Sequence, residues 1–466
     1  MPAERSPGTK LLITIIIGLM LSVPLAMVYA LVWDRQSQSE TAQASIAAGW
    51  GGPQTLVGPV LVLPYEREDV ETTTVDGRAQ TRTIKTRQEL FLSPVDNRLT
   101  TRVVPQRLRK SIYESVLYDA QNSGEARFAL PEDFARYGVP VTAIDFARAE
   151  LRFGLADARG LQANASVTIN GLSRPLLPGK GLAATRGSGF FTFVDWSGQA
   201  PLTVAYRYAA RGNGRLNFVP RGQNSQWTVQ SVWPSPSFAG AFLPNSRRVE
   251  DRGFQARYAI SNLALGQAIV LTDDPAPLAE DVSGYDRSSG ISAAAPAANG
   301  SSQGASISLV EPVDLYSQVD RSVKYGFLFI GFTFLAFLMF DIVARARVAA
   351  AEYLLVGAAL VLFFVLLLAF AEVIGFTPAY LVAAAAIVGL LTAYSAAVLN
   401  SWKRARIIAG LLAGLYAALY VLLNLEAYSL LIGSLLLFVA LAAVMWGTRQ
   451  IDWSKAAEAE EPIAAT

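Results

Sequence analysis

The sequence predicts an α+β membrane protein with six transmembrane helices and one large β-rich, sandwich-like domain outside the membrane. Apolar runs long enough to cross ~30 Å of hydrocarbon, about 20 residues each, occur once near the N-terminus and five times in the last third of the chain. The stretch between them alternates apolar and polar residues with a period of two, which is typical of half-buried strands. Charged residues make up only 16% of the 466 residues, whereas a soluble domain carries about 25%.

The first predicted span is Leu11–Trp33, and it follows Arg5 and Lys10. Its apolar run is longer than the ~7–15 residues of a cleavable signal peptide. Residues 1–33 are therefore interpreted as a cytoplasmic start and a retained transmembrane signal anchor, with cleavage after Val28-Tyr29-Ala30 as the alternative. The other five spans form a predicted helical domain over residues 325–447: Tyr325–Ala344, Tyr353–Ala371, Phe376–Leu399, Ile407–Leu423 and Tyr428–Gly447.

The basic residues near the predicted spans indicate their orientation. Lys and Arg are enriched on the cytoplasmic side of membrane proteins. Nine of them flank one side of the spans, whereas the two short loops of the other side carry only Glu372 and Glu426. Both termini, including the tail 448–466, are therefore predicted to be cytoplasmic and residues 34–324 external. The nine residues are Arg5, Lys10, Arg345, Arg347, Lys403, Arg404, Arg406, Arg449 and Lys455.

Short strands separated by Gly, Asn and Pro predict a sandwich for residues 34–324, rather than a parallel α/β sheet. Two helices are expected within it, at Pro105–Gln121 and at Ser308–Lys324, because apolar residues recur there at helical spacing. Ser283–Ser306 is rich in Gly, Ser and Ala and is predicted to be a flexible loop. The alternating segments are Leu151–Leu155, Leu202–Tyr208, Trp227–Trp233 and Phe254–Ile260.

The absence of cysteine and histidine from the sequence excludes several kinds of chemistry. Disulfides, thiol nucleophiles, iron–sulfur clusters, Cys/His zinc sites and serine–histidine triads all need these residues. The net charge of +2 is too small for a protein that binds nucleic acid electrostatically. Carboxylate chemistry and Ser–Lys dyads stay open, but no motif places a lysine beside a serine to activate it. No catalytic, cofactor-binding or metal-binding residue is therefore assigned.

Three acids lie at the ends of predicted spans: Asp341, Glu372 and Glu426. Ionisable residues inside a membrane are candidates for proton relays. All three lie at the ends of their spans, which favours a role at the membrane interface. Asp341 can also pair with Arg345 at i+4. Glu352 stands at a helix start, where the helix dipole favours a carboxylate.

Small and polar residues in the fifth predicted span suggest helix packing. Gly410 and Gly414 form a GxxxG pattern, which lets helices approach closely, and packing within the chain is favoured over dimerisation. Asn424 is interpreted as an interhelical hydrogen-bond donor rather than a ligand.

The external aromatic residues suggest either a sugar-stacking platform or a protein core, and their period-two spacing favours the core. Nearby acids could form a glycosidase pair, but the sequence gives no measure of the ~5–9.5 Å separation that such a pair requires. Asp273, Asp274 and Asp281 lack the ordered spacing of a calcium loop, so a polar turn is favoured. The aromatic residues are Trp196, Tyr206, Tyr208, Trp227 and Trp233, and the acids are Asp195, Glu250 and Asp251.

The most distinctive stretch begins at Gly49–Gln54 and continues through Gly58–Tyr65. Its glycines permit positive φ and close backbone approach, and it lacks the phosphate-loop and dinucleotide patterns. Val60–Leu63 is predicted to be a buried strand. The stretch is interpreted as the entrance to the external fold, close to the membrane.

Two long passages of the chain resemble the CreD family of bacterial inner-membrane proteins. They are GWGGPQTLVGPVLVLPY at Gly49–Tyr65 and EPVDLYSQVDRSVKYGFLFIGFTFLAFLMF at Glu311–Phe340. Trp233–Ile260, YVLLNLEAYSLLIGSLLLF and the closing RQID are similar too, whereas Ser283–Ser306 does not contribute. The resemblance implies an inner-membrane protein of cell-envelope integrity and stress response whose external domain is periplasmic. It implies no catalytic residue, cofactor or substrate.

These observations favour a non-enzymatic protein that recognises wall material or a periplasmic protein while its helices lie in the lipid bilayer. A transporter or lipid-handling protein that uses Asp341, Glu372 and Glu426 is the first alternative. A glycan-acting enzyme with external carboxylates is the second. No cofactor or nucleic-acid partner is expected, and the oligomeric state stays open.

Overall fold

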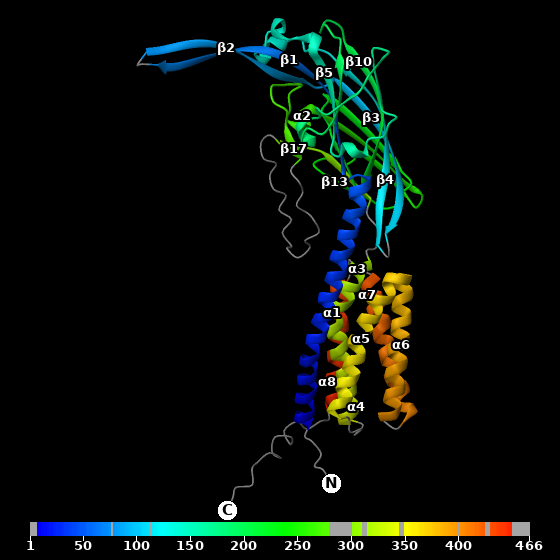
Figure 1. Cartoon of the computed structure of the whole chain (residues 1–466). Coiled ribbons are helices and arrows are strands. Elements are labelled where there is room, and N and C mark those ends of the chain that lie inside the picture. The colour runs from blue at the N-terminus through cyan, green and yellow to red at the C-terminus, as the bar shows by residue number, and fades with distance from the viewer. Residues whose placement is uncertain are drawn as a thin grey trace, which may run out of the picture. The chain divides into compact units, whose positions relative to one another are not determined.

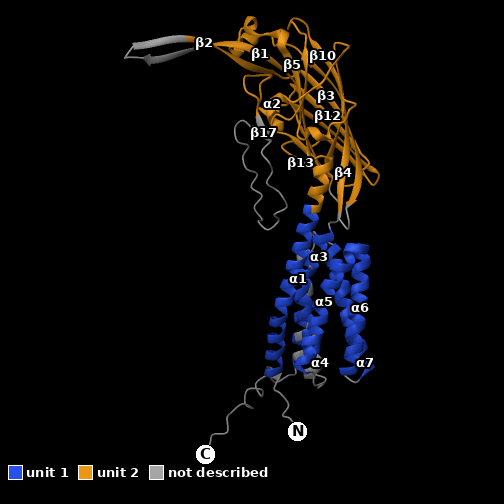
Figure 2. Cartoon of the chain, in the orientation of Figure 1, with its two compact units in different colours: residues 1–41, 313–466 blue, residues 42–312 orange. Residues whose placement is uncertain are grey.

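The computed structural model describes residues 7–75, 78–110, 113–278, 301–309, 315–343, 349–398, 401–424 and 429–449. The chain divides into two compact units (Figure 2). Residues 1–41 and 313–466 form the helical unit, and residues 42–312 form the β-rich unit. Helix α1, Pro7–Trp50, is continuous and contributes residues to both units.

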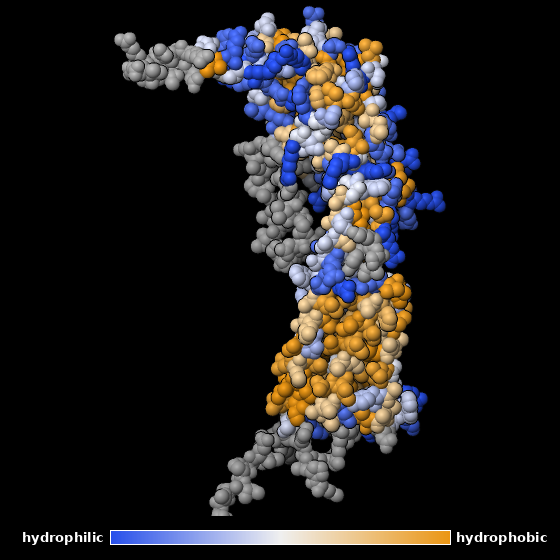
Figure 3. Space-filling model, viewed as in Figure 1, coloured by the Kyte–Doolittle hydropathy of each residue, from blue (hydrophilic) through white to orange (hydrophobic). Residues whose placement is uncertain are grey.

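The helical unit is strongly apolar on its surface (Figure 3). Four described helices are long and apolar enough to cross a membrane, rather than the six that the sequence predicts. These four are Thr9–Trp50, Ala350–Ile374, Phe376–Val398 and Trp402–Asn424. Helices α4 and α8 stand at the positions of the second and sixth predicted spans. The helices after α1 are α3 (Leu315–Lys324), α4 (Gly326–Val343), α5 (Ala350–Ile374), α6 (Phe376–Val398), α7 (Trp402–Asn424) and α8 (Ser429–Thr448).

Helix α1 runs well past Trp33, where the predicted first span ends. Within the polar part, side-chain hydrogen bonds at i,i+4 join Gln38 to Asp34 and Gln36 to Glu40. Such pairs support helix on an exposed surface. The polar part contains no Pro, and its first Gly is Gly49 in the last turn, so the helix continues well past its apolar segment.

An aromatic cluster forms the core between α5, α6 and α7. The ring of Phe363 lies 4.6 Å from that of Tyr416 and 5.5 Å from that of Tyr380, both in edge-on arrangements. The hydroxyl of buried Tyr380 donates to the carbonyl oxygen of Tyr416 at 2.7 Å. Edge-on aromatic pairs add stability beyond the area that they bury.

The β-rich unit contains two large sheets (Figure 1). The nine-stranded sheet has the order β13–β19–β11–β1–β5–β9–β8, with β2 paired to β1 and β16 paired to β2. Its strands are β1 (Gln54–Val75), β2 (Arg78–Leu92), β5 (Ala149–Leu155), β8 (Leu177–Pro178), β9 (Gly189–Val194), β11 (Arg215–Val219), β13 (Pro236–Gly240), β16 (Val270–Leu271) and β19 (Ala305–Leu309).

The eight-stranded sheet has the order β14–β15–β12–β3–β4–β10–β6–β7. Its strands are β3 (Asp96–Lys110), β4 (Tyr113–Phe128), β6 (Ser166–Ile169), β7 (Leu172–Arg174), β10 (Leu202–Asn213), β12 (Asn224–Ser231), β14 (Ser246–Glu250) and β15 (Gly253–Ser261). β17 (Ala276–Leu278) and β18 (Ser301–Ser302) form a separate pair, and α2 (Asn262–Leu265) follows β15.

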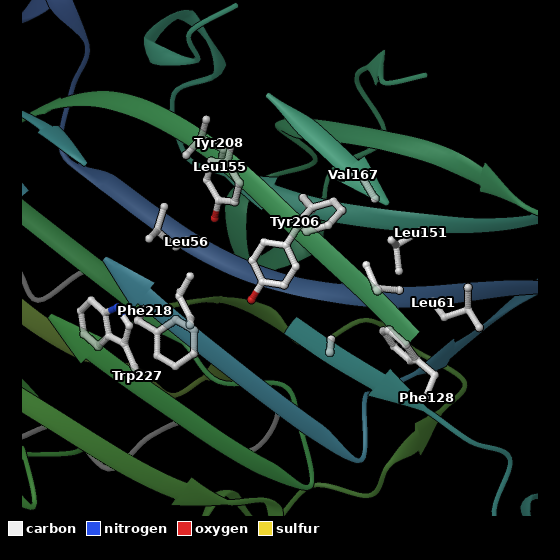
Figure 4. Close-up of a cluster of buried hydrophobic side chains, with 14 of the residues drawn as sticks. Leu56, Leu61, Phe128, Leu151, Leu155, Val167, Tyr206, Tyr208, Phe218 and Trp227 are labelled. Carbon is white, nitrogen blue, oxygen red and sulfur yellow. The ribbon is translucent and has the colours of Figure 1, made fainter. Parts of the chain in front are cut away.

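The two large sheets share one hydrophobic core, as the sequence predicts for a sandwich (Figure 4). The nine-stranded sheet contributes Leu61, Leu151 and Phe218, and the eight-stranded sheet contributes Phe128 and Trp227. The predicted strand Val60–Leu63 lies within β1, and all four of its side chains are fully buried. The predicted alternation also holds on β10 and β15.

The helix predicted at Pro105–Gln121 is wrong, because β3 and β4 pair there as an antiparallel hairpin. Pro105 stands opposite Tyr118 and Leu108 opposite Ser115. Tyr118, Ala120 and Asn122 are buried at period two, so the strand alternation decides the structure. The helical spacing in the sequence was coincidental.

Four other features differ from the predictions. Residues 283–300 of the predicted flexible loop lie outside the described residues, but its end belongs to strands β18 and β19. The helix predicted from Ser308 begins at Leu315, because Ser308 and Leu309 complete β19. β5 is buried on both faces rather than one, and Trp233 lies beyond the end of β12.

Candidate functional site

Of the three predicted membrane acids, the structure describes the side chain of Glu372 alone. Glu372 is half-buried near the end of α5 and accepts a hydrogen bond from the hydroxyl of Tyr316 at 3.2 Å. Asp341 belongs to α4, although its side chain is not described, and Glu426 lies outside the described ranges. Glu352 stands in the first turn of α5, as predicted, and its carboxylate accepts from the backbone N–H of Ala349 at 2.8 Å.

The described residues do not support the close packing expected at Gly410 and Gly414, and the prediction for Asn424 is wrong. A Cβ atom added at Gly410 or Gly414 would meet no described atom within 4 Å, so this GxxxG pattern packs against no described helix. The amide of Asn424 donates to the carbonyl oxygen of Tyr420 in its own helix at 2.9 Å, rather than across to another helix. Both residue patterns are too common to predict a contact without the tertiary structure.

The external aromatic residues are core residues, as their spacing favours. All five are buried, and the indole N–H of Trp227 donates to the hydroxyl of Thr101 at 3.0 Å. The hydroxyl of Tyr206 donates to Asn97 at 2.8 Å. Their rings are therefore not free to stack on a sugar.

The predicted acidic candidates lie apart from this core. Asp195 forms an exposed ion pair with Arg174 at 2.9 Å, and Glu250 lies 3.7 Å from Arg248 at the surface. Asp251 stands in the turn between β14 and β15. Asp281 lies outside the described part of the chain, whose residues hold no group of three His, Cys, Asp or Glu side chains able to bind a metal.

The distinctive stretch at Gly49–Gln54 forms the most elaborate polar site of the β-rich unit. We call it the helix–sheet junction, and it comprises Trp50, Gly52, Gln54, Asp157 and Arg211. Its members come from the end of α1, the start of β1, the segment after β5, and β10. Sequence analysis identified the stretch but not its partners, which lie more than 100 positions away along the chain.

Gln54 is fully buried at the centre of the helix–sheet junction. Its side-chain Nε2 donates to the carbonyl oxygen of Arg211 at 2.6 Å and to that of Asp157 at 3.0 Å. Its Oε1 accepts from the backbone N–H of Asp157 at 3.1 Å. Both amide protons and the amide oxygen are therefore satisfied, as a buried glutamine requires.

Asp157 connects the junction to the backbone that leaves α1. Its Oδ2 accepts from the backbone N–H of Gly52 at 3.1 Å, and the guanidinium of Arg159 binds the same carboxylate at 2.8 Å. The hydrogen bonds from Arg159, opposed by partial burial and assisted by Gly52, lower the pKa of Asp157 to about 2. The carboxylate is therefore ionised throughout the neutral range.

The last residue of α1 is held by a stacking contact. The guanidinium of Arg211 lies over the ring of Trp50, 4.3 Å from its centroid, in a cation–π arrangement. Gly51 has φ +142°, and an added Cβ would lie 2.8 Å from the carbonyl oxygen of Arg211. A side chain is excluded there by both conformation and space, which explains the glycine.

A second polar cluster lies on the face of the nine-stranded sheet that points away from the sandwich core. Arg152 on β5 donates to Glu150 at 3.0 Å and to Glu89 at 2.8 Å, and Lys180 also pairs with Glu150. Burial works against the charge of Arg152, but Glu89 and Glu150 together raise the pKa of its guanidinium. The two positive and two negative charges compensate one another. The cluster therefore stabilises the loop that contains Lys180, between β8 and β9, rather than presenting a reactive group.

A buried ion pair continues this face. Arg221 donates to Asp274 at 2.9 Å, and the other oxygen of Asp274 accepts from the backbone N–H of Ala183. Burial lowers the pKa of Arg221, although Asp274 counteracts the effect. Asp274 is thus engaged in a protein contact rather than free to bind calcium.

Comparisons with known proteins cover nearly the whole chain. A family model described as "Inner membrane protein CreD" matches residues 6–454. The protein "Inner membrane protein CreD" of Escherichia coli (strain K12) is 30% identical over 444 residues, covering 93% of this chain and 91% of that relative. A crystal structure of an M1 zinc metallopeptidase from Deinococcus radiodurans overlaps 36% of this chain and 38% of its own, with 9% identity and a TM-score of 0.18. So slight a likeness supports no inference about fold or chemistry.

Proposed function

Since this chain belongs to the CreD family of inner membrane proteins, we propose that it supports bacterial cell-envelope integrity under stress without catalysing a reaction. In this proposal six helices lie in the inner membrane, both termini are cytoplasmic and the β-rich unit is periplasmic. That unit recognises wall material or a periplasmic protein, and the helices anchor or relay the contact.

The helix–sheet junction is the observation that supports a relay of this contact from the β-rich unit to the helices. Helix α1 is continuous from Pro7 to Trp50, and it contains an apolar segment able to cross a membrane. Its last residue is stacked on Arg211, the backbone N–H of Gly52 donates to Asp157, and the buried Gln54 donates to the carbonyl oxygen of Arg211. A force on the β-rich unit would therefore reach α1 through short polar contacts instead of a slack linker.

Envelope resistance in a host that lacks its own copy would test this function. The chain should restore growth in detergent and under wall-active compounds. A flexible Gly-Ser-Gly-Ser insertion after Ser39 in α1 should abolish that rescue while leaving the junction intact. The same insertion after Gly171, in an exposed turn between β6 and β7, is the matched control and should preserve rescue.

Two results would contradict parts of the proposal separately. An unchanged envelope in the deletion host under every stress would overturn the envelope role. Full rescue by the Ser39 insertion, at equal membrane abundance, would overturn the relay and leave only anchoring. Resistance of the β-rich unit to trypsin shows that the inserted variants remain folded.

A transporter role through the membrane acids is the second candidate, and Glu372 is the acid that the structure describes best. Its hydrogen bond to Tyr316 joins α3 to α5, which equally suits a structural contact. The triple change Asp341→Asn, Glu372→Gln, Glu426→Gln separates the two roles. Full rescue by this variant would make proton coupling through these acids untenable.

A further inference from the structure

An apolar groove of about 300 Å³ runs between α1 and α4 inside the helical unit. Its volume is at the lower end of the range for small-molecule sites, roughly 300–1,000 Å³. The groove opens outward, because Ile15 and Phe327 on its rim are more than half exposed. The lining residues are Leu11, Thr14, Ile15, Gly18, Ser22 and Leu25 of α1, and Phe327, Ile330, Gly331, Phe334, Leu335 and Leu338 of α4.

The spacing of glycines explains why the helices leave a groove there. Near the middle of its apolar segment α1 packs tightly, because a Cβ at Gly357 of α5 would overlap the side chain of Leu21. A Cβ at Gly326 of α4 would lie only 2.9 Å from Leu25. Farther along both helices, a Cβ at Gly331 would meet no described atom within 4 Å, and one at Gly18 would meet only Phe334 at 4.0 Å. Close contact thus gives way to open space.

The two hydroxyl groups in the lining have no need of a ligand. Thr14 donates to the carbonyl oxygen of Lys10 at 2.9 Å, and Ser22 donates to that of Leu19 at 2.6 Å. Both bonds lie within α1, and no described lining residue is charged. An apolar cavity without free polar partners does not hold ordered water.

The occupant of this groove must therefore be apolar and available within a bilayer. α1 has the length and hydropathy of a membrane span, and α4 carries one acid, Asp341, in 18 otherwise uncharged residues. An unfilled groove forfeits the dispersion contacts of its lining. A flexible hydrocarbon chain can enter from the open side and restore them.

We propose that this groove binds one acyl chain of a membrane phospholipid as a resident lipid of the helical unit. The inference goes beyond the envelope role and does not rest on it. Its physical basis is the open space at Gly18 and Gly331, which a larger residue would fill.

The test uses the full chain in vesicles of phosphatidylethanolamine and phosphatidylglycerol that contain a phosphatidylethanolamine with a diazirine on one acyl chain. After illumination, mass spectrometry locates the labelled residues. We expect labelling to concentrate on groove residues such as Ile15 and Leu335, above the level at exposed Leu381 and Leu390 of α6.

The double variant Gly18→Leu, Gly331→Leu fills the groove. It should lower groove labelling, and the amount of phospholipid retained after detergent purification, by about tenfold, equivalent to roughly 1.4 kcal/mol. Gly389→Leu is the matched control, because Gly389 is exposed on α6 and its added Cβ also meets no described atom within 4 Å. This control should change neither quantity.

Two outcomes would overturn the proposal. Labelling spread evenly over groove and α6 residues would mean that bulk lipid alone contacts the chain. Conversion of a dimer to a monomer by the double variant, without a change in retained lipid, would mean that a second copy covers the groove. Single Gly331→Leu chains provide the same readouts if the double variant fails to fold.

Discussion

At the scale of single residues, the polar side chains of the helix–sheet junction have the most constrained environments. Gln54 uses its whole amide within the protein, and its backbone N–H donates to the hydroxyl of Tyr118 at 3.3 Å. That hydroxyl donates in turn to the carbonyl oxygen of Arg215 at 2.6 Å. Such a network is costly to leave half-satisfied, because each unpaired buried group keeps its desolvation penalty.

Replacing Gln54 by alanine should destabilise the β-rich unit by about 2–4 kcal/mol, since an unpaired buried polar group costs roughly 1–3 kcal/mol. The change removes the partners of the Asp157 and Arg211 backbone groups. Denaturant unfolding of the purified protein, followed by tryptophan fluorescence, measures the loss. Gln106→Ala is the control, because Gln106 is exposed on β3 and makes one long bond of 3.4 Å to Asp119. Equal losses in the two variants would contradict the argument.

The low pKa of Asp157 predicts a specific dependence of stability on pH. Its folded-state pKa is about 2, below the ordinary value of 3.8. The ionised carboxylate therefore stabilises the native state above about pH 4, and this contribution disappears as the pH falls through about 2. Asp157→Asn should be less stable than the parent at pH 6, and the difference should shrink towards pH 2.

Unfolding midpoints of both proteins between pH 6 and pH 2 give the comparison. Asp133→Asn removes an exposed ion pair with Arg136, so it reports the general effect of losing one carboxylate. A stability difference for Asp157→Asn that stays constant over this pH range would show that its hydrogen bonds do not depend on ionisation.

At the scale of elements, β1 and β2 form an unusually long hairpin. They pair from Leu61 opposite Leu92 out to Val75 opposite Arg78. In the outer part of the hairpin, past Tyr65 and its isolated bridge to Ile144, no other described strand pairs with β1 or β2. Two-stranded ribbons are marginally stable on their own, so the outer part of this hairpin adds little to the stability of the sandwich.

Shortening the hairpin tests whether its outer part contributes to the stability of the sandwich. Deletion of residues 68–85, with an Asn-Gly turn joining Arg67 to Thr86, keeps a cross-strand pair at the new end. Arg87 also remains, and with it the ion pair to Asp145. We expect the free energy of unfolding to change by no more than about 1 kcal/mol, since surface changes away from the core are usually small. Loss of the cooperative transition would show that the ribbon is part of the folding core.

At the scale of the whole molecule, the proposed orientation determines what the β-rich unit can reach. The bias of Lys and Arg in the short loops supports a periplasmic location for this unit. The absence of cysteine from the sequence permits a clean labelling test of that location.

Single-cysteine variants report the side on which each segment lies. Ser173→Cys in exposed β7 should react with a membrane-impermeant maleimide in intact cells whose outer membrane has been permeabilised. Ser454→Cys in the C-terminal tail should react only after lysis. The reverse pattern would place the β-rich unit in the cytosol and overturn the proposed envelope role.

Local patterns predicted much of this architecture. The apolar runs located helices, because burial in hydrocarbon depends on the composition of about 20 neighbouring residues. The alternation on β10 and β15 located half-buried strands in the same way. The prediction failed at Pro105–Gln121, where the residues fit both the helical and the strand period. Pairing with β10, far along the chain, decided in favour of strands.

The sequence by itself determined which segments are apolar helices, that a β-rich domain lies between them, and that cysteine and histidine chemistry is absent. Only the tertiary structure decided the contacts of Gln54, whose partners Asp157 and Arg211 are 103 and 157 positions away. It also decided the groove between α1 and α4, which Gly18 and Gly331 both line. Composition and periodicity act over neighbouring residues, whereas hydrogen bonds and cavities depend on which distant surfaces meet.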